Sequence, residues 1–302
     1  MLALNSGLGH QTRMTSLQSE LQRRGINTEL RIVEQNFQAS DLESVVGYRL
    51  LVVDCRDIDF SIELVNALKP TIIVVDNLSQ SRWQLNLPDH LKSKCFFYDT
   101  LPHPKLDHEF MKIMNQILFD EQILQQKNFI QKRDNQNTND SRKNNQTKIC
   151  FYAGFDGFLN PQTISTIDRL GKDLPNYTRI GGNLPIFSRS KYLNLISNSN
   201  FVITYPGLSF YESLFLNSTP ILIETKSEVH DQLSRYLTKR IGCVYLTTQA
   251  LFQSQNLLQM LVDDKKVSQS LDLDLSQWQQ SVRSKSGISK LADLIEERLN
   301  DS

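Results

Sequence analysis

Residues 1–25 read MLALNSGLGHQTRMTSLQSELQRRG, and this stretch decides how the rest of the chain is interpreted. The apolar run at residues 1–5 is long enough for a buried strand, and residues 6–9 form a tight glycine turn. From Gln11 onward, apolar residues recur at helical spacing, and Gly25 stands where the cap of a helix C-terminus is expected. The stretch therefore predicts a strand, a glycine loop and a helix, which together turn backbone N–H groups toward an anion in front of the loop.

Two side chains near this loop suit chemistry on an anionic ligand. His10 lies at the mouth of the turn, and Arg13 follows one helical step later. A histidine can hold or move a proton near neutral pH, and an arginine is a fixed, forked cation that suits phosphate or carboxylate. An ordinary capped turn with a solvated arginine would explain either residue alone. The complete string G-x-G-H-x-x-R, which begins with Gly7 and Gly9, is more specific.

Gly7, Gly9, His10 and Arg13 resemble the amino-terminal signature of a group of two-domain nucleotide-sugar enzymes. The group includes the UDP-sugar hydrolase of pseudaminic acid synthesis, the spore-coat polysaccharide biosynthesis proteins and the lipid-II-forming N-acetylglucosaminyltransferase. The resemblance implies an α/β fold of the GT-B type, in which two Rossmann-like domains face each other across a cleft. Dinucleotide binding is the competing interpretation, but it requires G-x-G-x-x-G, and Thr12 stands at the third glycine position.

The composition excludes several classes of protein. A length of 302 residues suits two domains, and 33 basic residues balance 33 acidic ones, so net charge gives no argument for binding nucleic acid or an anionic membrane. No apolar segment approaches the roughly 18 residues of a membrane span, and we expect no signal peptide. Four scattered cysteines without a C-x-x-C pair indicate reduced thiols in a cytosolic protein, and five histidines without paired spacing argue against a metal site.

Short apolar runs alternate with helical stretches along the chain, a pattern typical of parallel β-α units. The runs expected to form strands lie at residues 27–33, 49–53, 71–75, 95–98, 148–153, 177–180, 201–205, 220–224 and 244–246. Several strands of the first half end in Asp or Asn, among them Asp54 and Asp76. The carboxyl ends of strands form the ligand crevice of such a sheet, although capping of the next helix is the alternative role of each residue.

Residues 125–148 interrupt this pattern with the polar string QQKNFIQKRDNQNTNDSRKNNQTK. Such a segment buries too little apolar surface to offset its ordering entropy, so we expect a mobile linker or a surface insertion. The interruption separates an expected N-terminal Rossmann-like domain at residues 1–124 from an expected C-terminal, nucleotide-binding Rossmann-like domain at residues 149–302.

The segment VVDNLSQSR at residues 74–82 resembles the aspartate-containing strand end, followed by an arginine, of the hydrolase group. Asp76 and Arg82 are the matching positions, and the resemblance implies that they bind substrate. The group usually has two consecutive aspartates here, and Asn77 replaces the second one.

The most informative stretch of the second half is YPGLSFYE at residues 205–212. Gly207 allows close backbone approach to a ligand, Ser209 can donate a hydroxyl to a phosphate oxygen, and Glu212 could accept both hydroxyls of a ribose. The stretch resembles the donor-nucleotide motif of the transferases, which carries two glycines, a Ser or Thr, and a Glu. Pro206 replaces the first glycine and removes one backbone donor.

Four further residues complete the predicted substrate-binding set. Asp231 and Gln232 resemble the acidic residue and glutamine that contact the donor sugar in the same group. Gly154 and Gly181 each follow a predicted strand, in loops suited to close backbone approach.

The leading hypothesis is a nucleotide-sugar hydrolase that acts at the anomeric centre of a UDP-sugar or similar substrate in surface-glycan biosynthesis, with His10 activating a water. The alternative is a GT-B glycosyltransferase with a nucleotide-sugar donor, in which His10 deprotonates an acceptor hydroxyl. Helix N-termini can stabilise the leaving diphosphate in either case, so we expect no metal and no cofactor. A third hypothesis is a non-catalytic nucleotide-sugar-binding protein, which Pro206 and Asn77 would suit. A nucleotide-sugar 2-epimerase has a similar fold, but its carboxylate and histidine set has no evident counterpart here.

Overall fold

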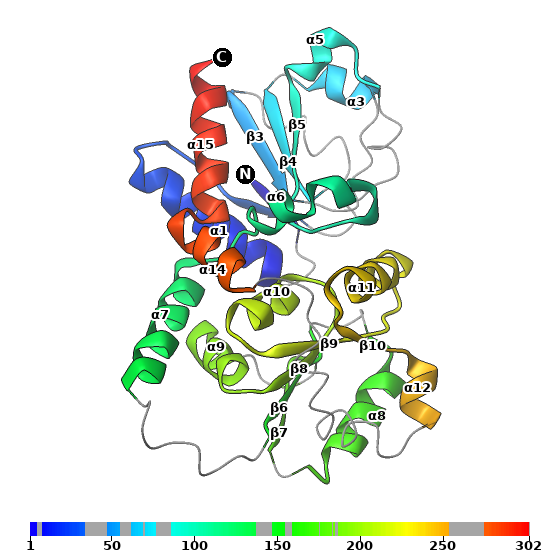
Figure 1. Cartoon of the computed structure of the whole chain (residues 1–302). Helices are drawn as coiled ribbons and strands as arrows, with labels where there is room; N and C mark the ends of the chain where they lie inside the picture. Colours follow the sequence, from blue (N-terminus) through cyan, green and yellow to red (C-terminus); the bar gives the residue numbers. More distant parts are fainter. Residues whose placement is uncertain are drawn as a thin grey trace. The chain divides into compact units, whose positions relative to one another are not determined.

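The computed structural model divides the chain into two α/β units (Figure 1). It describes residues 1–4, 8–33, 47–54, 62–68, 70–76, 86–136, 147–154, 159–174, 176–182, 184, 187–253 and 275–301. Unit 1 comprises Met1–Pro102, His108–Asp120 and Ser281–Ser302, and unit 2 comprises His103–Asp107 and Glu121–Gln280. The last helix of the chain therefore returns to unit 1.

Unit 1 is built on a five-stranded sheet with the order β2-β1-β3-β4-β5, in which every pair of neighbours is parallel. The strands are β1 (Leu2–Leu4), β2 (Arg31–Val33), β3 (Leu50–Asp54), β4 (Thr71–Val75) and β5 (Cys95–Tyr98). The central strands β3 and β4 are continuous apolar runs buried along nearly their whole length, as expected of strands that are covered on both faces. The order places the carboxyl ends of β1, β3 and β4 along one edge of the sheet.

The helical segments of unit 1 include α1 (Leu8–Arg23), α3 (Ile62–Ala67), α5 (Asp89–Lys92), α6 (Phe110–Met114) and α15 (Gly287–Asn300). A 3-10 helix at Pro104–Glu109 has residues in both units. Met14, Leu17 and Leu21 recur on one face of α1 and are fully buried. They share a core with Leu291 and Ile295, from the apolar face of α15.

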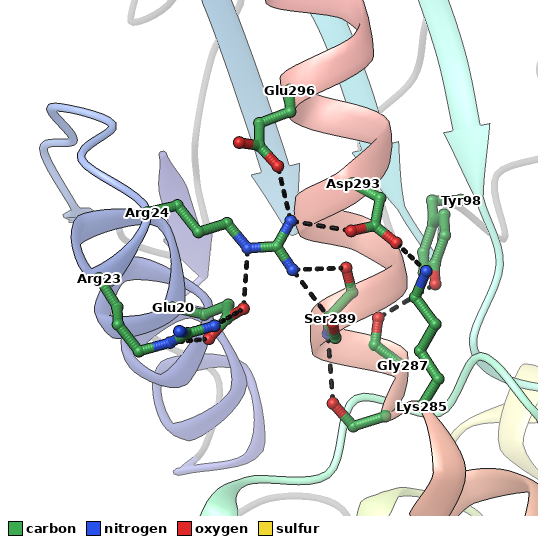
Figure 2. A network of polar contacts seen from close by, with 10 residues as sticks. Glu20, Arg23, Arg24, Tyr98, Lys285, Gly287, Ser289, Asp293 and Glu296 are labelled. Carbon is green, nitrogen blue, oxygen red and sulfur yellow. Dashed lines mark hydrogen bonds and ion pairs between the residues drawn. The ribbon is translucent and has the colours of Figure 1, made fainter.

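Arg24, directly after α1, ties that helix to α15 through polar contacts (Figure 2). Its Nη1 donates to Asp293 Oδ1 at 2.8 Å and to Glu296 Oε2 at 2.7 Å. Its Nε donates to Glu20 Oε1 at 2.8 Å, and burial, which alone would lower the pKa of Arg24, is outweighed by these carboxylates, so the pKa lies above its usual range. This network and the apolar contacts assign residues 281–302 to unit 1, which corrects the predicted C-terminal domain of residues 149–302.

Unit 2 contains a second five-stranded parallel sheet, with the order β10-β9-β8-β6-β7. Its strands are β6 (Ile149–Tyr152), β7 (Tyr177–Ile180), β8 (Phe201–Thr204), β9 (Thr219–Ile223) and β10 (Val244–Leu246). The helices of this part of the chain include α7 (Glu121–Gln136), α8 (Pro161–Gly171), α9 (Arg189–Ser197), α10 (Leu208–Phe215), α11 (Glu228–Ile241), α12 (Thr248–Gln253) and α14 (Leu275–Ser284). None of the helices within the described ranges is both long and apolar enough to cross a bilayer.

Helix α7 corrects the linker predicted at residues 125–148, because residues 125–136 are helical. Ile123, Lys127 and Ile130 are buried on one face of this helix, four and three residues apart. These three buried positions hold α7, whose other residues are mostly polar, against the rest of unit 2. The remainder of the predicted linker, residues 137–146, lies outside the described residues.

Candidate functional site

The candidate functional residues of unit 1 form a buried polar cluster where α1 begins and where β3 and β4 end. His10 lies in the first turn of α1, and Asp54 is the last residue of β3. The Nδ1 atom of His10 is 2.8 Å from Oδ1 of Asp54, which is completely buried. A carboxylate can only accept, so we assign the ring proton to Nδ1, and Nε2 becomes the nitrogen with the basic lone pair. We call His10, Arg13, Asp54, Asp76 and Thr100 the His10 cluster.

Arg13 lies at the centre of the His10 cluster, with only 2% of its surface exposed. Its Nε donates to Asp54 Oδ2 at 2.5 Å, its Nη2 donates to Asp54 Oδ1, and its Nη1 donates to Asp76 Oδ2 at 2.8 Å. Nη2 also lies 3.1 Å from Nδ1 of His10, which is a close approach of two donors once Nδ1 carries its proton. The structure thus places Arg13 between two carboxylates, whereas the sequence had placed it on a substrate anion.

Asp76, predicted to bind substrate, instead supports Arg13. Its Oδ1 accepts from the backbone N–H groups of Thr100 at 2.5 Å and Leu101 at 3.1 Å. Its Oδ2 accepts from the Thr100 hydroxyl at 2.6 Å, in addition to the bond from Arg13. The residue adopts a left-handed conformation, with φ of 51°, directly after β4. Asp76 therefore joins the end of β4 to the loop after β5.

The charges of this cluster hold one another in their ionised forms. Burial alone would raise the pKa of Asp54, but the charges of Arg13 and His10 outweigh it and keep that pKa well below its usual range. Burial alone would lower the pKa of Arg13, but Asp54 and Asp76 raise it above its usual range. The cluster therefore presents His10 with one permanent cation and an ionised carboxylate.

Gly9 is the remaining predicted residue of unit 1 that lies within the described ranges. Gly9 lies in the first turn of α1, and nothing lies within 4 Å of a Cβ added there, so this position does not require glycine for space. Gly7 and Arg82 were also predicted to bind substrate, and Asn77 was noted beside Asp76. All three lie outside the described residues.

In unit 2, Gly154 and Gly181 lock together the loops that follow β6 and β7. Both have left-handed backbones, with φ of 71° and 80°. A Cβ on Gly181 would lie 2.6 Å from the carbonyl oxygen of Gly154, and a Cβ on Gly154 would lie 2.3 Å from the hydroxyl oxygen of Tyr205. The same carbonyl of Gly154 accepts from the backbone N–H of Gly182 at 2.5 Å. These glycines are required by the packing of the two loops against each other.

The candidate functional residues of unit 2 surround Glu212 in α10, whose side chain is 1% exposed. Its Oε1 accepts from Arg189 Nη2 at 2.5 Å, and its Oε2 accepts from the Tyr192 hydroxyl at 2.7 Å. Ser209 lies buried on the same helix, and the ring of Tyr152 packs against the ring of Tyr192. We call these five residues the Glu212 cluster. It brings together two predicted residues, Ser209 and Glu212, next to Gly207, which precedes α10.

Aromatic rings line this cluster. The ring centroids of Tyr152 and Tyr192 are 5.5 Å apart, and those of Tyr152 and Tyr205 are 6.2 Å apart with nearly parallel planes. Burial, reinforced by the charge of Glu212, raises the pKa of Tyr152 to about 12, so its hydroxyl keeps its proton. The guanidinium of Arg189 lies 5.3 Å from the centroid of the Tyr192 ring.

Asp231 and Gln232 lie in the first turn of α11. Asp231 Oδ1 accepts from the backbone N–H of Thr225 at 2.9 Å, and therefore holds the loop after β9. Gln232 is exposed, and its Nε2 donates to Glu228 Oε1 at 3.2 Å. Both contacts are local, and neither residue belongs to the Glu212 cluster as defined above.

Sequence reasoning missed five residues of the two clusters. Asp54 was noted only as a strand end, and Thr100, Tyr152, Arg189 and Tyr192 were not singled out. Asp54 and Tyr152 both close buried strands, which is the position where ligand-facing residues gather in parallel sheets. Across the described residues, no group of three or more His, Cys, Asp or Glu side chains is arranged to hold a metal ion.

No family model matches the chain, and no curated protein matches its sequence. Solved structures do match. CalG4, the calicheamicin glycosyltransferase, aligns with a TM-score of 0.56 at 11% identity and covers 99% of this chain and 97% of its own. The spinosyn rhamnosyltransferase SpnG aligns at 9% identity over 98% of this chain and 99% of its own, with a TM-score of 0.56 in complex with spinosyn aglycone and 0.54 in complex with thymidine diphosphate. The chain has the GT-B fold. The predicted fold class is thereby confirmed, and at these identities the likeness concerns the fold.

Proposed function

We propose that the protein is a glycosyltransferase with a nucleotide-sugar donor, and that His10 is the general base for the acceptor hydroxyl. The contact of 2.8 Å between Nδ1 of His10 and Oδ1 of Asp54 carries this proposal. It fixes the ring tautomer and assigns the basic lone pair to Nε2. The sequence ranks hydrolysis first, but CalG4 and SpnG, which share the fold, are named as a glycosyltransferase and a rhamnosyltransferase, which favours transfer.

The donor nucleotide is assigned to unit 2. Gly207 and the N-terminus of α10 offer backbone N–H groups to a diphosphate, and Ser209 offers a hydroxyl. Each oxygen of Glu212 accepts one hydrogen bond from the protein and has capacity for a second, which a ribose hydroxyl can supply. We assign Arg189, whose side chain is 22% exposed, to the diphosphate. A uridine diphosphate sugar, with two ribose hydroxyls and a diphosphate, satisfies these groups.

The proposed reaction is a single displacement with a balanced proton transfer. Nε2 of His10 takes the proton of the acceptor hydroxyl while the acceptor oxygen forms a bond to the anomeric carbon of the donor. The bond from that carbon to the diphosphate oxygen breaks, and its electron pair leaves with the nucleoside diphosphate. Asp54 stabilises the imidazolium that forms, and the groups of the Glu212 cluster stabilise the leaving charge.

The test is an NMR assay of the full chain with UDP-, TDP-, GDP- and CMP-sugars, in the presence of EDTA and with or without a panel of hydroxyl acceptors. We expect one nucleotide class to bind, and its sugar to be transferred only when an acceptor is present. His10→Asn should lower turnover by about 100-fold or more while donor binding stays unchanged. The matched control is His108→Asn, since the side chain of His108 is 74% exposed.

Two outcomes would contradict the proposal. Release of free sugar at the same rate without any acceptor would restore the hydrolase hypothesis. A failure to bind any nucleotide sugar would remove the role assigned to the Glu212 cluster, and with it the donor.

A further inference from the structure

The carboxylate that orients His10 is shared with a buried arginine. Asp54 accepts from Nδ1 of His10 through Oδ1, while the fork of Arg13 reaches both of its oxygens through Nε and Nη2. A histidine that faces a buried carboxylate alone is stabilised as the imidazolium, because the opposite charge favours the protonated ring. A protonated ring cannot accept a proton, so a carboxylate without a second cation lowers the fraction of the ring that can act as a base near neutral pH.

We propose that Arg13 keeps His10 in its neutral, proton-accepting form by neutralising most of the charge of Asp54. The catalytic meaning of this inference rests on the proposed function, but the protonation of His10 can be measured without it. Arg13 is 2% exposed, so its charge is poorly screened by water at the distance of 3.1 Å that separates Nη2 from Nδ1 of His10. Arg13 is then a positioning residue that acts through Asp54.

Within the described part of the chain, charged groups come to this ring from α1 and from the ends of β3 and β4. Arg13 comes from α1, Asp54 from the end of β3, and Asp76 from the end of β4. Asp76 is held away from His10 by its bonds from Thr100 and Leu101, and it reaches the ring only through Arg13. Asp76 thus fixes the third arm of the guanidinium, and this leaves the Nε and Nη2 edge to Asp54.

The experiment is a titration of the histidine ring signals of the full chain by NMR. The chain has only five histidines, and the signal of His10 is assigned by its loss in His10→Asn. In the wild type we expect the titration midpoint of His10 at or below about 7, near the ordinary value of about 6.5. In Arg13→Gln we expect the midpoint to rise by about one pH unit or more. The acidic limb of the pH profile of turnover should move to higher pH by the same amount.

Three further variants separate charge from structure. Arg13→Lys keeps the positive charge and should show less than half of the shift. Arg13→Gln with Asp54→Asn removes the carboxylate as well and should return the midpoint to within about half a unit of the wild type. Arg23→Gln is the matched control, because Arg23 lies on the same helix, is 71% exposed at its side chain and pairs with Glu20, so the midpoint should not move.

Arg13→Gln leaves two buried carboxylates without their cation. If this variant does not fold, the double variant Arg13→Gln with Asp76→Asn takes its place. The same upward shift of the His10 midpoint is expected in it. A wild-type midpoint above about 7.5, or an unchanged midpoint in every folded variant that lacks Arg13, would overturn the inference. If the midpoint shifts as expected but no sugar is transferred, the proposed function fails and the assignment of Arg13 stands. If transfer occurs and the midpoint does not shift, only the assignment of Arg13 fails.

Discussion

Arg189 and Glu212 form an ion pair between α9 and α10, with Nη2 of Arg189 2.5 Å from Oε1 of Glu212. The carboxylate is almost fully buried, whereas the side chain of the arginine is 22% exposed. A partly exposed guanidinium can turn toward an incoming anion, while the carboxylate keeps its bond from Tyr192. The pair therefore contains both charged groups of the proposed donor site: Arg189 for the diphosphate and Glu212 for the ribose.

Arg189→Gln should weaken the binding of a nucleoside diphosphate by about tenfold and leave the binding of the bare nucleoside unchanged, because the lost contact is a charge-assisted bond to phosphate. Isothermal titration calorimetry with both ligands measures the difference. Lys191→Gln removes the same charge from the same helix at an exposed position and serves as the control. Equal losses for diphosphate and nucleoside would show that Arg189 supports the cluster without contacting phosphate.

The lowered pKa of Asp54 predicts that the free energy of unfolding depends on pH. Its pKa is lower in the folded chain than in the unfolded chain, where it is about 4, so its contribution is fully present above about pH 5 and is lost as the pH falls. Asp54→Asn lacks this contribution at every pH but keeps a hydrogen-bond acceptor. The difference in free energy of unfolding between wild type and variant should shrink as the pH falls from about 6 to about 3. Urea denaturation at several pH values measures it, and a constant difference would refute the prediction.

Arg24→Ala should lower the free energy of unfolding of unit 1 by about 1–3 kcal/mol, because Arg24 donates to three carboxylates from a position that is only 14% exposed. Arg23→Ala is the matched control and should change it by less than about 0.5 kcal/mol, since its pair with Glu20 is exposed to solvent. Hydrogen exchange of the amides in α1 and α15 reports on unit 1 alone. Equal effects of the two variants would contradict the role of Arg24.

Gly181→Ala should destabilise unit 2 by about 1–3 kcal/mol, because the residue has φ of 80° and the new methyl would lie 2.6 Å from the carbonyl oxygen of Gly154. In Gly9→Ala, by contrast, the new methyl group has no atom within 4 Å, and the residue lies in a helix. The free energy of unfolding of this variant should therefore be unchanged or slightly higher. Thermal unfolding of both variants tests the pair. A neutral Gly181→Ala would mean that the two loops can separate at little cost.

Local patterns in the sequence were sufficient to predict the fold class and several elements. The apolar runs expected at residues 71–75, 95–98 and 177–180 coincide with β4, β5 and β7. These elements have apolar spacing and clear boundaries of their own. The strand expected at residues 27–33 is shorter in the structure, where β2 covers only Arg31–Val33.

The contacts of the site depend on strand order, which local patterns do not reveal. His10 meets Asp54 because β3 lies beside β1 in the sheet, although 44 residues separate them in the sequence. The burial of Arg13 between two carboxylates follows from the same neighbour relationship, whereas the sequence predicted that Arg13 binds a substrate anion. The return of α15 to unit 1 is a contact between segments far apart in the sequence, and local patterns do not reveal such a partner.

This return has a consequence for the order in which the protein is made. The buried face of α1, with Met14, Leu17 and Leu21, is covered in part by Leu291 and Ile295. These last two residues leave the ribosome after the whole of unit 2. The core of unit 1, the unit that carries His10, therefore cannot be completed until α15 has been synthesised, and until then this apolar face of α1 lacks part of its cover.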